Sequence, residues 1–256
     1  MASNRSPSRA AIFLIALAAS AQTRQEAVEP HMGTLVRVVF YADNATPARA
    51  AFERIAGIDR ALSDYRPSSE LNQLCGAQGG ELTGDLAKLI PVALEIARET
   101  NGAFDPTLAA LTRHMPEPPE SYGWKRVVFD GKRITLNGVC FDLGGIAKGY
   151  AAQEALHALA SRGVKRAMVA VSGDICTSGG EWKIGAQRRT VTISNACIST
   201  SGNESQPGHI FDPRTGERSL RPGEVTVISH DGARADALAT AHHLMSPPGT
   251  WVDERR

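Results

Sequence analysis

Residues 140–151 read C-F-D-L-G-G-I-A-K-G-Y-A, and the rest of the chain is best understood around them. An apolar run that predicts a strand delivers Asp142, and a stretch with helical spacing begins after Gly144 and Gly145. This order places a turn of bare backbone at a helix N-terminus, where unpaired N–H groups and the helix dipole favour an anion. Lys148 adds a positive charge at the same place, and Asp142 is suited to a cation or a ribose hydroxyl.

The same residues also fit a purely structural interpretation, in which glycines cap a helix and Lys148 lies in solvent. The stretch is not a Walker A loop, because no Gly-Lys-Ser/Thr follows at the required spacing. It is not a dinucleotide-binding fingerprint either, because G-x-G-x-x-G is absent. Its meaning therefore depends on residues elsewhere in the chain.

The first 21 residues have the three parts of a secretory signal peptide. Arg5 and Arg9 give a positive start, residues 10–18 are apolar, and residues 19–21 read A-S-A, a small-residue cleavage site. We expect cleavage before Gln22 and a periplasmic location. Residues 22–256 then form a single domain.

The composition argues against nucleic-acid binding, because the formal net charge is +1 and aromatic residues make up 5% of the chain. The four cysteines are Cys75, Cys140, Cys176 and Cys197. An exported chain with an even number of cysteines permits disulfides. Since three of the four lie in strand-like runs where a buried thiol packs well, we favour free thiols. No C-x-x-C spacing is present, so the cysteines do not predict a zinc site.

Two loops before residue 140 carry candidate binding residues. Tyr65 lies in a polar loop, where it would be either a packing residue or a lid over a planar ring. Residues 103–107 read A-F-D-P-T and follow an expected helix at 83–100, which stops at Asn101-Gly102. A rigid loop of this kind suits the wall of a binding site, but Asp105 would also serve as the N-cap of a following helix.

The remaining elements alternate between helical and strand-like patterns. A short helix should begin after Ser68 or Ser69, with Glu70 in its first turn. The other expected helices span 47–61, 147–161 and 235–240. The expected strands are 35–41, 127–129, 134–136, 167–171, 181–187, 190–194 and 225–229.

A second group of chemically capable residues lies toward the C-terminus. His209 begins the segment H-I-F-D-P-R-T-G and is the general-base candidate, because its unperturbed pKa lies near neutrality. Asp236 and Thr240 are four residues apart on an expected helix, so they project from one face and can share a cation. Oxygen ligands of this type suit Mg²⁺.

Eight segments, taken in order between residues 32 and 240, resemble the ApbE family of FAD:protein FMN transferases. They read M-G-T, S-D-Y-R-P-S-S-E-L-N, G-A-F-D-P-T, D-L-G-G-I-A-K-G-Y-A, V-S-G-D-I, S-T-S-G-N, H-I-F-D-P-R-T-G and A-D-A-L-A-T. The resemblance implies an α+β fold with two lobes, mixed sheets with flanking helices, and FAD in the cleft between the lobes. It also implies a reaction in which FMN passes through its phosphate to a threonine of an exported redox protein, and AMP leaves.

The resemblance implies roles for particular residues. His209 and Lys148 would be catalytic, and Gly145 (through its carbonyl), Asp236 and Thr240 would bind Mg²⁺. The flavin contacts would be Met32, Tyr65, Ala103, Phe104, Asp105, Asp142, Lys148 and Ile210. The implied partners are FAD, the threonine-bearing acceptor and, through peripheral association, membrane redox complexes.

Two departures and two alternatives accompany this resemblance. The family usually has N-x-G-G-D where this chain has V-S-G-D, which leaves the role of Asp174 open. The sequence also stops at Arg256, soon after Thr240, which leaves open whether the C-terminal strand or helix that often closes the family's fold is present. The first alternative function is a Mg²⁺-dependent FAD pyrophosphatase with water as acceptor. The second is a periplasmic flavin-binding protein without enzymatic activity.

Overall fold

A computed structural model describes residues 22–204 and 207–255, and the expected signal peptide lies outside these residues. A seven-stranded sheet forms the larger lobe, with the strand order β1-β2-β6-β7-β10-β13-β14. Neighbouring strands are antiparallel except for β13 and β14, which are parallel. The strands are β1 (Thr23–His31), β2 (Thr34–Ala42), β6 (Ala167–Val171), β7 (Asp174–Ser178), β10 (Cys197–Gly202), β13 (Glu224–Ser229) and β14 (Trp251–Asp253).

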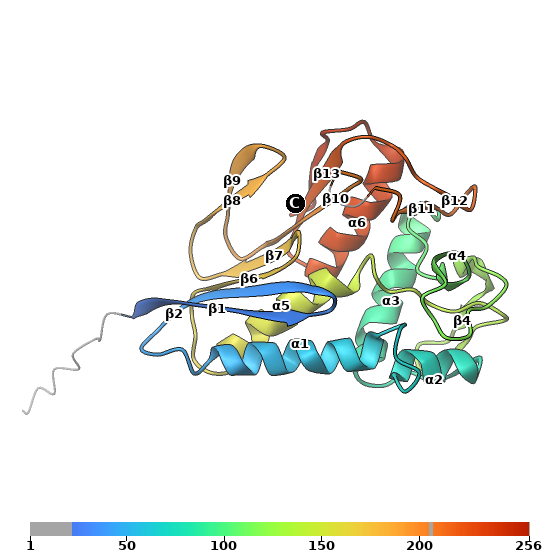
Figure 1. Ribbon diagram of the computed structural model, residues 1–256, viewed down its shortest axis with the longest axis horizontal. Helices are drawn as coiled ribbons and strands as arrows, with labels where there is room; N and C mark the ends of the chain where they lie inside the picture. The colour runs from blue at the N-terminus through green and yellow to red at the C-terminus, as the bar shows by residue number, and fades with distance from the viewer. Residues whose placement is uncertain (1–21, 205–206, 256) are drawn as a thin grey trace, which may run out of the picture.

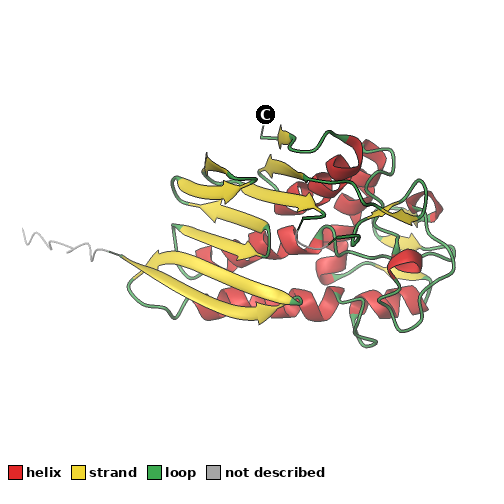
Figure 2. Ribbon diagram, turned by 45° about the horizontal axis from the view of Figure 1, so that its top comes forward, coloured by secondary structure: helices red, strands yellow, loops and turns green. Residues whose placement is uncertain are grey.

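Helices cover one face of this sheet, as Figures 1 and 2 show. Helices α5 (Ala147–Ala160) and α6 (Gly232–Met245) pack directly on the strands, while α1 (Ala48–Leu62) packs mainly against α5 and α3 (Gly84–Glu99) against α6. All four were expected as helices, α1 and α3 from the 3.6-residue spacing of their apolar side chains. Their buried apolar residues belong to the main core. The predicted stop of α3 is confirmed, because Asn101 and Gly102 both adopt positive φ.

The backbones of α5 and α6 touch where they cross. A Cβ atom on Gly149 would collide with the carbonyl oxygen of Gly232, and a Cβ on Gly232 would collide with that of Gly149. Glycine is therefore required at both positions by close approach rather than by an unusual φ. The contact brings the next turn of α6 beside the beginning of α5, at residues 140–151.

The opposite face of the sheet carries a smaller core beneath the hairpin of β8 (Trp182–Ala186) and β9 (Arg189–Ile193). Ile184 and Ile193 of the hairpin pack with Ile198 of β10 and Ile228 of β13. In β13 the neighbouring Val227 belongs to the main core, so successive residues of this strand serve opposite faces.

The second lobe is built from short elements, seen to the right of the large sheet in Figure 1. Ser69 caps α2, as expected, by accepting a 3.0 Å hydrogen bond from the Asn72 amide. The predicted hairpin around Asp130-Gly131 is present as β4 and β5. The elements are α2 (Glu70–Gly76), β3 (Gly79–Glu81), α4 (Ala109–Thr112), a 3₁₀ turn (Trp124–Arg126), β4 (Val128–Phe129), β5 (Arg133–Thr135), β11 (Phe211–Asp212) and β12 (Glu217–Arg218).

The prediction of free thiols is wrong, because all four cysteines form disulfides. Cys176 of β7 and Cys197 of β10 occupy facing positions of the sheet, with Cα atoms 4.0 Å apart. Cys75 of α2 and Cys140 have Cα atoms 5.4 Å apart, which suits a disulfide. Burial of strand-like cysteines was a sound inference, but pairing depends on strand neighbours that the sequence did not supply.

The sequence left open whether a closing element follows Thr240, and the structure contains one. Residues after α6 turn back and add β14 to the edge of the sheet, parallel to β13. Within residues 22–204 and 207–255, none of the helices has the combination of length and apolar character that crossing a membrane requires.

Candidate active site

Asp236 caps the beginning of α5. Its Oδ2 accepts a 3.0 Å hydrogen bond from the Gly149 amide, although 87 residues separate the two in the chain. The anion that this helix N-terminus was predicted to favour is therefore, in part, a carboxylate of the protein itself. The cap fixes α6 against residues 140–151.

Two buried carboxylates lie near the start of α5. Asp174, at the start of β7, and Asp236 have exposed fractions of 6% and 4%. Burial, together with the negative charge of Asp236, raises the pKa of Asp174 to about 7. Burial also raises the pKa of Asp236, while Lys148 and the Gly149 amide oppose that shift.

Lys148 supplies positive charge to the same group of side chains. Its Nζ donates a 3.0 Å hydrogen bond to the Gly144 carbonyl oxygen. Burial alone would lower its pKa, but the negative charges of Asp236, Asp174 and Asp142 outweigh burial and raise it. Lys148 is therefore held as a cation near these carboxylates, and the residue is half-buried rather than fully in solvent.

Gly145 and Thr240 are neighbours, as the proposed metal ligands must be. A Cβ atom on Gly145 would lie 3.4 Å from Thr240 Oγ1 and 3.5 Å from a ring carbon of Phe104. Thr240 Oγ1 also lies 3.2 Å from Ser201 Oγ, at the end of β10. The absence of a side chain at Gly145 therefore leaves room between the α5 turn, α6 and Phe104.

The loop at 103–107 lies alongside residues 140–142. The Asp142 amide donates to the Pro106 carbonyl oxygen over 2.8 Å, and Leu108 forms a parallel β-bridge with Cys140. Ala103, Phe104 and Asp105 are all buried.

Asp105 organises this loop from within. It accepts hydrogen bonds from the Thr107 amide at 2.8 Å, the Thr107 hydroxyl at 2.6 Å and the Trp124 amide at 3.0 Å. The N-cap of α4 is Leu108, so Asp105 is not that cap. Its carboxylate fixes the loop conformation through these hydrogen bonds, and the Phe104 ring of the same loop lies beside Gly145.

Tyr65 packs beside a cluster of polar side chains that includes His114 and Asp64. Its side chain is 65% exposed and stacks on the His114 imidazole, with ring centroids 4.8 Å apart and 18° between planes. Burial, followed by the negative charges of Asp64 and Asp142, raises the pKa of Tyr65. The second face of this aromatic ring is a platform on which a planar ligand can stack.

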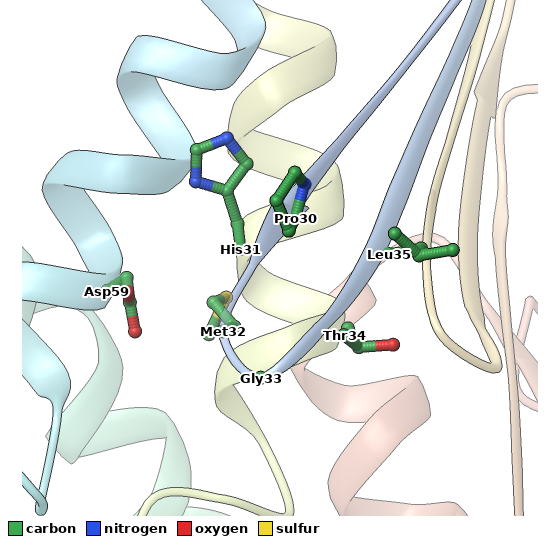
Figure 3. Close-up of a pocket in the computed structure, with 7 residues that line it drawn as sticks. All are labelled: Pro30, His31, Met32, Gly33, Thr34, Leu35 and Asp59. Atoms are coloured by element: carbon green, nitrogen blue, oxygen red, sulfur yellow. The ribbon is translucent and has the colours of Figure 1, made fainter.

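Met32 occupies the tip of the β1–β2 hairpin, with a φ of 50°. The tip and Asp59 of α1 enclose an open hollow of about 610 Å³, drawn in Figure 3. The residues that line it are Pro30, His31, Met32, Gly33, Thr34, Leu35 and Asp59. Of the predicted flavin contacts, Met32 belongs to this hollow.

His209 lies in an exposed position before β11, and Ile210 beside it is buried. The charge of His209 contributes to lowering the pKa of His243, after burial and together with Arg221. His243 is on α6, three residues after Thr240. The structure thus brings His209 to the helix that carries Asp236 and Thr240.

The donor atoms at the start of α5 fit Mg²⁺. When both buried carboxylates are ionised, their charge exceeds that of the single lysine, and a divalent cation would offset this excess. The Asp236 carboxylate, the Thr240 hydroxyl and the Gly145 carbonyl are oxygen donors of the kind that Mg²⁺ prefers.

The sequence profile of the ApbE family matches residues 32–254. The chain belongs to the ApbE family. A Vibrio cholerae relative named FAD:protein FMN transferase is 25% identical over 266 residues, covering 84% of this chain and 80% of the relative. The Escherichia coli K12 relative of the same name is also 25% identical, over 74% of this chain and 68% of its own. These named relatives are transferases, and membership of the family confirms that the chain is an enzyme of this class.

Solved structures confirm the expected fold. The apo flavinyl transferase ApbE of Pseudomonas stutzeri superposes with a TM-score of 0.78 at 22% identity, over 89% of this chain and 88% of that one. The ApbE protein of Thermotoga maritima gives 0.76 at 28% identity, over 87% of each chain. The expected two-lobed α+β arrangement of mixed sheets and flanking helices is therefore correct.

Three polar residues of the site were missed or left open by the sequence. The role of Asp174 was left open, although it is a buried acid beside Asp236. Asp64 and His114 were not singled out, although they meet below Tyr65. A signal existed for Asp174, because an acid that begins a buried strand needs a polar partner. No local pattern marks the other two.

Proposed function

We propose that this chain is a Mg²⁺-dependent FAD:protein FMN transferase that attaches FMN through its phosphate to a threonine of an exported redox protein. One observation carries the proposal. Asp174 and Asp236 are both buried near the start of α5, their negative charges act on Lys148, and Thr240 Oγ1 lies close to Gly145. Family membership and the names of the relatives give this arrangement its substrate.

The balanced reaction needs an acceptor, a leaving group and a proton acceptor. The threonine oxygen forms a bond to the phosphorus of the FMN half of FAD, the bridging P–O bond breaks, and AMP leaves with the bridging oxygen. A threonine hydroxyl is a weak nucleophile at neutral pH, so a base must take its proton. His209 is the residue that we assign to this step, since it is exposed and its charge acts on His243 of α6.

The protein's own groups position the diphosphate. Lys148, held as a cation by its acidic neighbours, donates to oxygens that gain negative charge. When bound by Gly145, Asp236 and Thr240, Mg²⁺ supplies further neutralisation of that charge. Tyr65 offers its exposed ring face to a planar group of FAD, and Phe104 closes the site beside Gly145.

The test uses FAD, Mg²⁺, the protein spanning residues 22–256 and a candidate exported acceptor. We expect the intact mass of the acceptor to rise by one FMN less water, with AMP released in equal amount. An acceptor whose target threonine is replaced by alanine should stay unmodified. Free FMN with an unmodified acceptor would instead indicate hydrolysis, and tight FAD binding without AMP would indicate a carrier.

Asp236→Ala gives the matching test on the enzyme, with Asp130→Asn as a control on the exposed β4–β5 turn. The first variant should lose AMP release at ordinary Mg²⁺ while keeping its circular dichroism, and the control should keep full activity. Full turnover by Asp236→Ala would contradict the assignment of this residue as a metal ligand. Periplasmic location follows from the signal peptide expected at residues 1–21, and export of a tagged chain would test it.

A further inference from the structure

Three side chains from three distant segments meet beside the proposed flavin site. Asp64 comes from the loop between α1 and α2, His114 from the chain after α4, and Asp142 from residues 140–151. One ligand atom of each lies within 4.8 Å of the others. The two carboxylates are sheltered, with side-chain exposures of 14% and 12%, and the imidazole is 41% exposed.

Within this group, the His114 imidazole hydrogen-bonds to Asp64 but does not reach Asp142 Oδ2. His114 Nδ1 lies 3.0 Å from Asp64 Oδ2 and 3.9 Å from Asp142 Oδ2. A single Nδ1–H makes a good hydrogen bond to the nearer oxygen, but 3.9 Å is too long for a bond to the other. A cation in place of that proton could be shared by all three side chains, because one ligand atom of each lies within 4.8 Å of the other two.

The composition of the group selects the kind of cation. One imidazole with two carboxylates is typical of Zn²⁺, Mn²⁺ or Co²⁺ sites, whereas Mg²⁺ prefers oxygen donors and water. Metal–ligand distances of about 2.0–2.2 Å require only modest side-chain movement from the present separations.

The surroundings hold two of the three side chains in place. Asn72 donates from its side-chain amide to the carbonyl oxygens of Asp64 at 2.9 Å and Arg66 at 2.7 Å, which fixes the Tyr65 loop. Asp142 is anchored through its own amide to Pro106 and accepts a 2.8 Å hydrogen bond from the Gly144 amide.

We propose that Asp64, His114 and Asp142 form a second divalent-metal site, selective for a Zn²⁺-like ion and distinct from the Mg²⁺ ligands at Asp236 and Thr240. The bound ion ties the Tyr65 loop to residues 140–151. Because Tyr65 stacks on His114, the ion also fixes the aromatic ring that is offered to FAD. The site therefore acts on ligand positioning rather than on the bond that breaks.

The test is calorimetric titration of tag-free, chelator-treated protein with Zn²⁺, in excess Mg²⁺ so that the Asp236 site is occupied. We expect one Zn²⁺ per chain. His114→Ala should weaken this binding at least ~100-fold, since removing outer-shell partners of a metal already costs about 10–100-fold. His157→Ala is the matched control, because His157 Nδ1 also lies 3.0 Å from a carboxylate, that of Glu154, and its variant should bind Zn²⁺ normally.

Two outcomes would overturn the proposal: no stoichiometric Zn²⁺ binding by the unaltered protein, or unchanged binding by His114→Ala. Asp64→Asn serves as a second variant if His114→Ala unfolds, and retention of Zn²⁺ affinity there would be equally contrary. The role assigned to the ion rests on the proposed function and has its own measurement. Zn²⁺ should tighten FAD binding in the unaltered protein and not in Tyr65→Ala, whereas Zn²⁺ binding itself is measured without FAD.

Discussion

Asp174→Asn should remove a pH dependence of stability that the metal-free protein owes to its buried acids. The asparagine side chain has nearly the shape of a protonated aspartate but cannot ionise. The wild-type carboxyl, by contrast, must either stay protonated or place a charge next to Asp236. The comparison therefore isolates the cost of ionising Asp174.

The size of the effect follows from the two pKa values. In the unfolded chain the carboxyl titrates near 3.8, and in the folded chain near 7. Between these values the folded state binds more protons than the unfolded state, so the free energy of unfolding falls as pH rises. At about 1.4 kcal/mol per pH unit, the wild type should lose up to about 4 kcal/mol relative to Asp174→Asn between pH 4 and pH 7. The loss belongs to the Asp174–Asp236 pair, because the two titrate together.

Urea unfolding of both proteins with EDTA, at half-unit steps from pH 4 to pH 8, measures this difference. A parallel series with Mg²⁺ at about 100 times its Kd should restore roughly 2.7 kcal/mol to the wild type at neutral pH, since the cation binds the ionised form. Asp130→Asn, on an exposed turn, should parallel the wild type. If wild type and Asp174→Asn keep a constant difference across the range, the inferred strain between the two buried carboxylates is wrong.

Three further predictions concern the flavin, the acceptor and the sheet. Tyr65→Ala should weaken FAD binding by ~1 kcal/mol, measured by fluorescence quenching. The melting temperature should not fall, because the exposed ring buries little surface in the folded protein. Unchanged FAD affinity would indicate that Tyr65 is a packing residue. His209→Ala should bind FAD normally yet transfer FMN about 10²–10⁴-fold more slowly, as expected when a general base is removed; a normal rate would exclude the base role. Replacing both Cys176 and Cys197 by alanine should lower the free energy of unfolding by about 3 kcal/mol for a loop of 21 residues, and equal urea midpoints would contradict the cross-strand pairing.

Local patterns predicted those parts of the fold whose causes are local. The apolar spacing that predicts α3 also buries Leu86, Leu89 and Ile90, and the Asn101-Gly102 stop needs only its own backbone conformation. Strand β1 was not predicted, because it is an edge strand with acidic residues at both exposed positions (Glu26) and half-buried positions (Glu29), so its sequence shows no apolar alternation.

The candidate site divides in the same way. Gly145, Lys148 and the Asp236–Thr240 spacing lie within short segments, so sequence order was enough to select them. The disulfides, the capping of α5 by Asp236 and the meeting of Asp64 with His114 all join residues at least 21 positions apart. Pairing over such separations is decided by the strand order and helix crossing, which no local spacing encodes.

The close backbone approach at Gly149 and Gly232 makes the relative position of α5 and α6 depend on both glycines. Any side chain at either position would push the helices apart, and Asp236 and Thr240 would move away from Gly145 with them. A chimera that brings a residue other than glycine to either position would therefore keep every chemical group of the site and still misplace them. Recombination and design on this scaffold should exchange the two helices together, with their glycines, as a single cassette.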